Sequence, residues 1–158
     1  MTADQHVREQ LTNLLMLRQA HMTFEDAIDG FPATAHNMRP AGVNYSFWHL
    51  LEHLRICQWD ILDYIRNPDY KELKFPDDLW PARDAEAREA DWNRTVEQFL
   101  SDRDELARIV NDPATDLYAQ IPHGYPGHTI LREILVVADH NAYHIGELGI
   151  LRQVAGLW

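Results

Sequence analysis

Two pairs of histidines in this sequence are each spaced four residues apart. His140 and His144 form the later pair, and His49 and His53 form the earlier one. Residues at this spacing lie one turn apart on the same side of a helix, so each pair can present two imidazoles to one point. Imidazole nitrogens bind zinc at about 2.0–2.1 Å. The leading interpretation is therefore a metal site shared by histidines of two helices.

The later pair is the stronger candidate because it shares a helix face with apolar residues. On a helix, both histidines lie on the side that carries Val137, Leu148 and Leu151. We therefore expect the two rings to point into the protein. Neutral imidazoles buried without partners are unfavourable, and a metal ion removes that penalty by binding their lone pairs.

A third ligand would come from the earlier pair. Counting about 100° per residue, the apolar stripe of its helix centres near Leu54 and Ile61. His53 lies closer to the edge of this stripe than His49 does. His49 is predicted to be exposed, and its alternatives are a place beside the site or a contact with substrate. Three histidines leave a coordination position open for water or substrate. The predicted metal ligands are His53, His140 and His144.

Four more side chains lie at helical spacing from these histidines. Glu133 precedes the later pair by two turns and Glu147 follows it by one, while Asp60 follows His53 by two turns. A carboxylate at such a place can orient an imidazole through its second nitrogen, although a carboxylate on the protein rim is more common. Cys57 follows His53 by one turn. Its thiolate could bind a metal ion, but a buried, inert thiol is more common.

A different metal motif also fits part of the earlier segment. The five residues from His49 to His53 match the inverted zinc-protease pattern, in which two histidines bind zinc and a glutamate, here Glu52, activates water. Three fixed positions in five arise easily by chance in a helix rich in histidine and glutamate. The motif also leaves His140 and His144 without a role, so we rank it well below the convergent site.

Composition is typical of a soluble cytoplasmic protein. The 158 residues are most simply one domain, 1–158, which is long enough to bury a core. A net charge of -11 without any cluster of lysine and arginine argues against nucleic-acid binding. The single cysteine fits a reducing compartment. The N-terminal residues contain no apolar signal core, and no segment approaches the roughly 20 apolar residues that cross a bilayer. We therefore expect no membrane partner.

Apolar residues recur with helical spacing, and no segment shows a convincing strand pattern. Thr23 and Asp26 form a pair that resembles a capping box and opens a short extra helix, which stops at Gly30. The predicted fold is an all-α four-helix bundle with this short helix after the first long one. Long helices are predicted over residues 5–19, 46–66, 84–110 and 129–151.

These motifs resemble those of a known family. Residues 46–55 and 139–148, together with the segments 20–24 and 129–133, resemble the DinB superfamily of small metal-binding four-helix bundles. The resemblance covers essentially the whole chain. It implies an up-up-down-down arrangement in which one histidine of the second helix and two of the last bind a divalent ion. Carried over by position, these ligands are His53, His140 and His144.

The sequence departs from the family pattern at two positions. His49 stands where such proteins often have another polar residue, and Glu147 stands where they often have Gln. Glu147 therefore adds negative charge near the predicted site.

The resemblance also implies a function. Some relatives are enzymes that use a low-molecular-weight thiol, such as mycothiol, bacillithiol or glutathione, and many others have no assigned activity. An open three-histidine site suits this chemistry because a bound ion lowers the pKa of a thiol. The first hypothesis is a metal-dependent thiol S-transferase-like enzyme that acts on small molecules, with zinc or nickel as the expected ion.

Two other functions stay open. A metal-dependent hydrolase of a small molecule would activate water and would need a carboxylate base such as Glu147, Glu133 or Asp60. A non-catalytic, stress-related bundle would hold a structural or adventitious ion, although structural zinc is usually closed by four protein ligands. Imidazole ligands also suit iron and copper. The five tryptophans are consistent with an apolar contact surface and hence with a homodimer.

Overall fold

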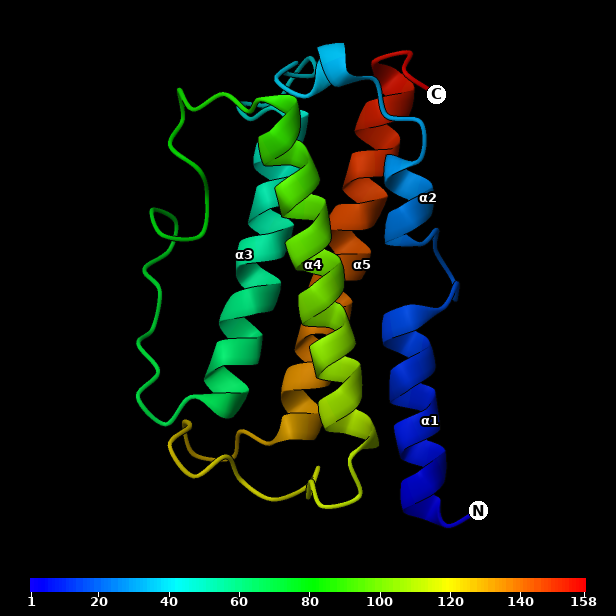
Figure 1. The fold of residues 1–158 in the computed structure, drawn as a ribbon, viewed down its shortest axis with the longest axis vertical. Helices are drawn as coiled ribbons and strands as arrows, with labels where there is room; N and C mark the ends of the chain where they lie inside the picture. Colours follow the sequence, from blue (N-terminus) through cyan, green and yellow to red (C-terminus); the bar gives the residue numbers. More distant parts are fainter.

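The computed structural model describes residues 1–158 and is entirely helical (Figure 1). Four long helices are accompanied by one short α helix and one turn of 3-10 helix, and there is no strand. The prediction of an all-α four-helix bundle with a short extra helix is therefore confirmed. The elements are α1 (Ala3–Met16), α2 (Phe24–Ile28), η1 (Ala33–Ala35), α3 (Phe47–Arg66), α4 (Glu89–Asn111) and α5 (Ile130–Val154).

Hydroxyl side chains at the N-caps explain where most helices begin. Thr23, Ser46 and Thr129 each accept a hydrogen bond from a backbone N–H in the first turn of the helix that follows. The Asp26 side chain completes the predicted capping box of α2 by accepting from the Thr23 backbone N–H, at 2.8 Å. These boundaries agree with the sequence prediction to within a residue or two.

The start of α4 differs from the prediction because a tertiary contact holds the preceding residues. The helix begins at Glu89 and not at Asp84. The Asn37 side chain binds the backbone of Ala87 twice, accepting from its N–H at 2.8 Å and donating to its carbonyl at 2.9 Å. Periodicity along one segment cannot show such a contact with a distant residue.

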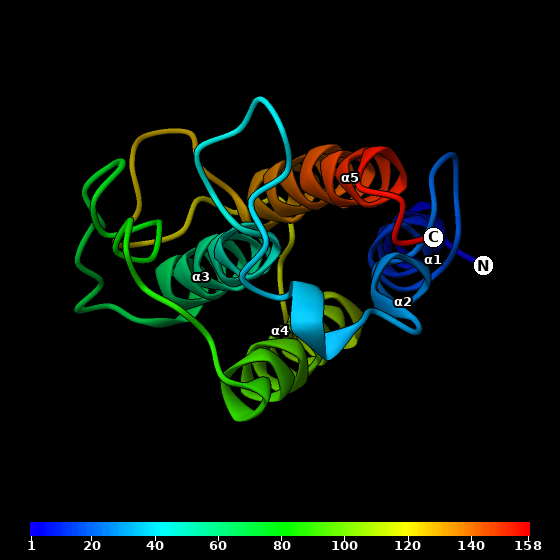
Figure 2. The same cartoon turned by 90° about the horizontal axis from the view of Figure 1, so that it is seen from above.

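The long helices pack around a common centre in the cyclic order α1, α4, α3, α5 (Figure 2). In the view of Figure 1, α1 and α5 run upward, whereas α3 and α4 run downward. The order along the chain is therefore up, down, down, up, which differs from the expected up-up-down-down arrangement. Because α3 and α4 run in the same direction, the connection 67–88 must travel the length of α3 back to the top.

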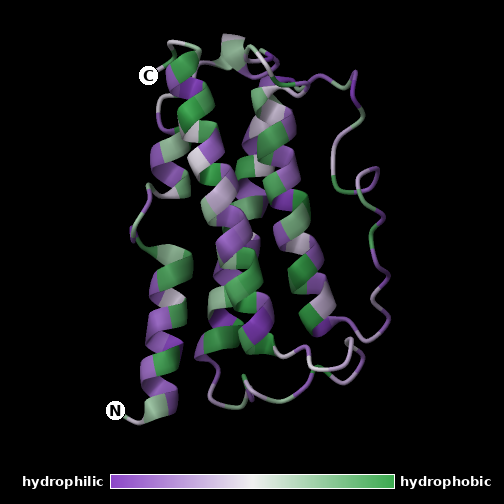
Figure 3. Ribbon diagram, turned by 180° about the vertical axis from the view of Figure 1, so that it is seen from behind, coloured by the Kyte–Doolittle hydropathy of each residue, from purple (hydrophilic) through white to green (hydrophobic).

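Two apolar clusters fill the interior along the bundle axis. Hydrophobic and hydrophilic residues alternate along every long helix, as an amphipathic bundle requires (Figure 3). Near the top of the bundle, the apolar core includes Phe24, Phe47, Leu54, Phe99 and Leu148. Near the bottom, it includes Leu62, Leu106, Val110, Ile134 and Val137.

A buried polar layer separates the two clusters. The Gln58 side-chain amide donates to the Phe99 carbonyl at 2.6 Å, and the Asn141 amide donates to the Gln58 carbonyl oxygen at 2.9 Å. Gln58 on α3 and Asn141 on α5 are thereby fixed at the same height in the bundle. Their neighbours His53 and His140 consequently meet across the same two helices. None of the helices has the length and apolar character needed to span a bilayer.

Candidate metal centre

Three imidazoles meet between α3 and α5, where the sequence analysis expects them. The ring centroids lie 5.1 Å apart for His53 and His140, 4.8 Å for His53 and His144, and 4.6 Å for His140 and His144. The two helices are in direct contact, so the four-residue spacing of the later pair places both of its rings opposite His53. The structure thus brings together all three predicted ligands, and their role in metal binding stays a prediction.

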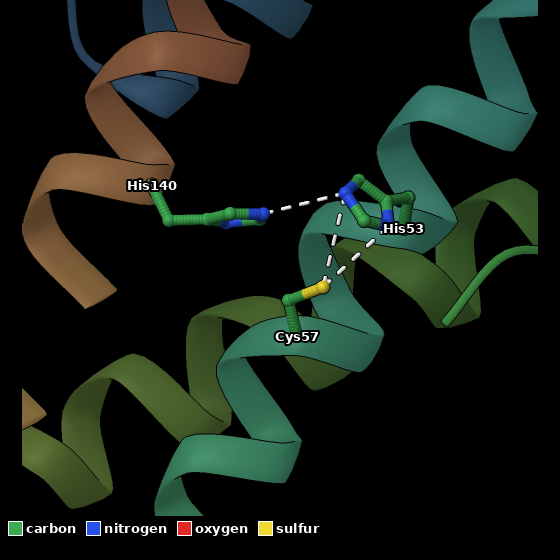
Figure 4. A group of neighbouring side chains, drawn as sticks. All are labelled: His53, Cys57 and His140. Atoms are coloured by element: carbon green, nitrogen blue, oxygen red, sulfur yellow. Dashed lines mark hydrogen bonds between the residues drawn. The ribbon is translucent and has the colours of Figure 1, made fainter. Parts of the chain in front are cut away.

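The hydrogen bonds of His53 determine which of its nitrogens faces the centre. Its Nδ1 lies 2.7 Å from the carbonyl oxygen of Leu79, and because a carbonyl can only accept, Nδ1 carries the proton. Its Nε2 lies 3.3 Å from Nε2 of His140 (Figure 4). The lone pair of one ring nitrogen therefore faces another ring nitrogen across the helix interface.

This arrangement fits a metal ion. For a tetrahedral ion with bonds of about 2.05 Å, two nitrogen ligands lie about 3.3 Å apart, and the observed separation of the two Nε2 atoms is 3.3 Å. Burial lowers the pKa of His53, and burial together with the charges of His144 and His53 lowers the pKa of His140 to about 4. Both rings are therefore neutral near pH 7, which is the form that binds a metal ion.

The third imidazole is oriented by a carboxylate. Nδ1 of His144 donates to Glu147 at 2.6 Å, and the other carboxylate oxygen of Glu147 accepts from the Tyr45 hydroxyl. Burial opposes ionisation of Glu147, but these two hydrogen bonds prevail and lower its pKa. The bond to Nδ1 leaves Nε2 of His144 as the nitrogen available to an ion. Glu147 therefore orients an imidazole, the role that the sequence analysis ranked below that of a carboxylate on the protein rim.

The other two candidate carboxylates lie away from the rings. Glu133 bonds to Arg132 at 2.6 Å and lies 3.3 Å from His128. Asp60 accepts a hydrogen bond from the Tyr70 hydroxyl at 2.9 Å. Neither residue is hydrogen-bonded to an imidazole of the centre.

Cys57, and not His144, joins His53 and His140 in the group of three donor residues whose atoms lie closest to one point. His53, Cys57 and His140 offer nitrogen and sulfur atoms that all lie within 4.8 Å of one another. Its sulfur lies 3.5 Å from Nδ1 and 3.8 Å from Nε2 of His53 (Figure 4). Burial raises the pKa of the Cys57 thiol to about 12, so it is protonated in the absence of a cation. The four-residue spacing from His53 was the sequence signal for this contact.

The connection 67–88 covers one side of the centre. Trp80 stacks on the His53 ring with a centroid distance of 3.9 Å and an interplanar angle of 7°. It also meets the His144 ring edge to face at 6.4 Å and the Tyr45 ring at 5.2 Å. No local pattern in the sequence indicated this contact, because Trp80 lies in a segment without helical periodicity.

The expectation that His49 is exposed is wrong. Only 3% of this residue is exposed, and the Ala82 carbonyl in the connection 67–88 accepts from its Nε2 at 3.0 Å. Its Nδ1 accepts from the backbone N–H of Ser46 at 3.1 Å. Counting along the helix alone missed the segment that packs over this face. Because both nitrogens bond to protein atoms, the His49–His53 motif does not form the inverted zinc-protease site.

Comparison with known proteins gives one result. A family model described as the DinB superfamily matches residues 16–148, which is well over half of the chain. The matched segment contains all three imidazoles and Cys57. Comparisons with curated proteins and with solved structures find no match.

Proposed function

The chain belongs to the DinB superfamily, and from that premise we propose that it is a metal-dependent thiol S-transferase acting on small molecules. The proposed ion is zinc or nickel, and the proposed cosubstrate is a low-molecular-weight thiol. The observation that carries the proposal is the pair of facing ring nitrogens, His53 Nε2 and His140 Nε2, 3.3 Å apart. Neutral, buried imidazoles at this spacing are a donor set for a divalent ion.

Hydrogen bonds around the rings determine which nitrogen of each ring is free to bind an ion. The Leu79 carbonyl fixes the His53 tautomer, and Glu147 fixes that of His144, so each ring keeps Nε2 free. Trp80 covers one face of His53 and keeps water from it. A bound divalent ion supplies a positive charge that lowers the pKa of a thiol, so that the thiolate can attack an electrophile.

The contacts of the carboxylates favour thiol transfer over hydrolysis. A hydrolase needs a carboxylate that is free to accept a proton from water. Both oxygens of Glu147 are engaged, one by His144 and one by Tyr45. Glu133 is paired with Arg132. A thiol whose pKa is lowered by the ion needs no such base. Thiol transfer therefore requires fewer catalytic side chains than hydrolysis does.

The test separates metal binding from catalysis. Protein without a histidine tag is analysed for bound metal, loaded with zinc or nickel, and mixed with a panel of thiols and an electrophile, and separately with esters and amides. We expect one ion per chain and consumption of thiol that depends on the metal. His144→Ala should lose both, whereas His6→Ala, at an exposed position on α1, should keep both. Turnover of esters or amides without thiol would instead support the hydrolase.

The homodimer, the cytoplasmic location and the absence of nucleic-acid and membrane partners stay predictions. Exposed fractions of 70% for Tyr143 and 64% for Ile150 leave apolar surface on α5 that a second copy could cover. Light scattering of the purified protein measures the oligomeric state directly.

A further inference from the structure

The side chain of Cys57 projects from α3 toward the space between His53 and His140 (Figure 4). Only 9% of the residue is exposed. It is the single cysteine of the chain, so no disulfide partner exists within it. Its position one turn after His53 repeats the arrangement of the histidine pair on α5, so each of the two helices offers two donors at four-residue spacing.

The donor atoms lie close enough together for comparison with a tetrahedral ion that includes the sulfur, since all three lie within 4.8 Å of one another. With bonds of about 2.05 Å to nitrogen and about 2.3 Å to sulfur, the nitrogen–nitrogen separation is about 3.3 Å and the nitrogen–sulfur separation about 3.6 Å. The observed separations are 3.3 Å between the two Nε2 atoms and 3.8 Å between Cys57 Sγ and His53 Nε2. The two Nε2 atoms therefore have the spacing of such a site. The sulfur lies closer to Nδ1 of His53, at 3.5 Å, than to Nε2, so the Cys57 side chain must turn toward the Nε2 side to reach the same ion.

No hydrogen bond ties the sulfur to a residue other than His53. Its hydrogen-bond contacts are with the two nitrogens of His53, at 3.5 Å and 3.8 Å. Nδ1 of His53 already donates to the Leu79 carbonyl and so cannot accept the thiol proton. A thiol that served only to fill the core would need no such orientation toward ring nitrogens.

We propose that Cys57 is a fourth protein ligand, which binds the ion as a thiolate beside His53, His140 and His144. The inference rests on the proposed function, because it presumes that the histidines hold an ion. The thiol proton leaves to solvent, and the sulfur lone pair forms the bond to the ion. A thiolate ligand favours zinc over harder ions such as magnesium or manganese.

This fourth ligand would regulate the site. Four protein ligands close a tetrahedral ion, which is the arrangement of structural zinc. A substrate thiol must then replace the Cys57 sulfur before it can react, so Cys57 holds the reactive position until a competing thiol arrives. Replacing Cys57 would weaken metal binding and open the centre to external thiols.

Cobalt provides a direct test because a thiolate bound to cobalt absorbs in the near ultraviolet and a tetrahedral cobalt ion absorbs in the visible. Metal-free protein is titrated with Co²⁺, and we expect both absorptions in the unmodified chain. Since the chain has one cysteine, a thiolate band can come only from Cys57. Cys57→Ser should lose the near-ultraviolet band, keep the visible absorption and bind zinc at least about tenfold more weakly. Adding 2-mercaptoethanol to this variant should restore the band.

The outcomes separate the two claims. Visible cobalt absorption without a thiolate band in the unmodified chain would overturn the role of Cys57 and leave the histidine site intact. An absence of stoichiometric cobalt binding, in a protein with a normal helical circular-dichroism spectrum, would overturn the proposed function itself. A second variant, Cys57→Ala, guards against weak binding by the serine hydroxyl and should give the same loss of the band.

Discussion

The seam between α3 and α5 carries histidine, glutamate and tyrosine at both of its ends, and the two ends are built differently. At the upper end, His53 Nε2 and His140 Nε2 face each other. In the lower cluster, which we define as Tyr64, His128, Arg132 and Glu133, His128 Nδ1 lies 3.0 Å from the Tyr64 hydroxyl and 3.3 Å from Glu133. Arg132 binds the same carboxylate at 2.6 Å.

The difference lies in the source of positive charge. The lower cluster contains its own cation, because the Arg132 guanidinium neutralises the buried Glu133. At the upper end, the hydrogen-bonding partners of Glu147 are His144 and Tyr45, neither of which carries a permanent charge. A divalent ion would supply the missing charge. Histidine, glutamate and tyrosine thus take part in an ion-pair network in the lower cluster. At the upper end, the same residue types leave ring nitrogens available to a metal ion.

The largest expected difference between the two ends is the loss of metal binding when one of the facing nitrogens is removed. His140→Ala should abolish stoichiometric zinc binding, because it removes one of the two Nε2 atoms of the upper end. His128→Ala, in the lower cluster, should still bind one ion per chain. Metal content after dialysis measures both, with circular dichroism to show that each variant is folded. Equal losses in the two variants would mean that the ends do not differ in this way.

Removing the metal should destabilise the protein through the upper end alone. An ion present at one hundred times its dissociation constant stabilises the folded state by about 2.7 kcal/mol. Urea unfolding with zinc and with a chelator measures this difference. We expect His128→Ala to keep the increment and His140→Ala to lack it; an increment in the latter would place the ion elsewhere.

The stability of the metal-free protein should depend on pH through the upper end. The pKa of His140, about 4 in the folded protein, lies below the value of a histidine in the unfolded chain. The unfolded state therefore binds more protons between pH 6.5 and pH 4. The burial-lowered pKa of His53 acts in the same direction. The free energy of unfolding should therefore fall as pH falls through this window, by about 2 kcal/mol. Urea titrations in chelator across the window test this, and His140→Ala should flatten the curve.

The smallest of these effects concerns the carboxylate that orients His144. Glu147→Gln keeps an oxygen that can accept from Nδ1 but loses the negative charge, so zinc should bind about tenfold more weakly. Glu133→Gln, the matched change in the lower cluster, should leave zinc affinity unchanged. Competition with a coloured chelator measures both affinities. An unchanged affinity in Glu147→Gln would show that the charge has no part in binding.

Much of the fold could be predicted from the sequence because its signals are local. Capping residues such as Thr23, Ser46 and Thr129 lie next to the helices that they begin. The convergence of His53 on the later histidine pair also followed, since the helix faces and the family resemblance agreed.

The rest of the candidate centre depends on a segment that has no periodicity. His49 is buried because Ala82 packs over it, and Trp80 stacks on His53 from the same connection. Neither contact leaves a mark in the spacing of α3. Cys57 had a spacing signal, but the same spacing also fits a buried thiol that only packs, so the sequence alone left both roles open.

Under the proposed function, changes in the connection 67–88 could alter the chemistry of the centre while the ligands stay the same. Within this connection, the Leu79 carbonyl fixes the tautomer of His53, and Trp80 covers one face of its ring. Related chains could therefore retune ion preference, exchange rate or substrate access by editing this surface segment, while the bundle that supplies the donors stays the same. We expect proteolytic cleavage within the connection 67–88 to weaken binding of the proposed ion while the helices stay folded.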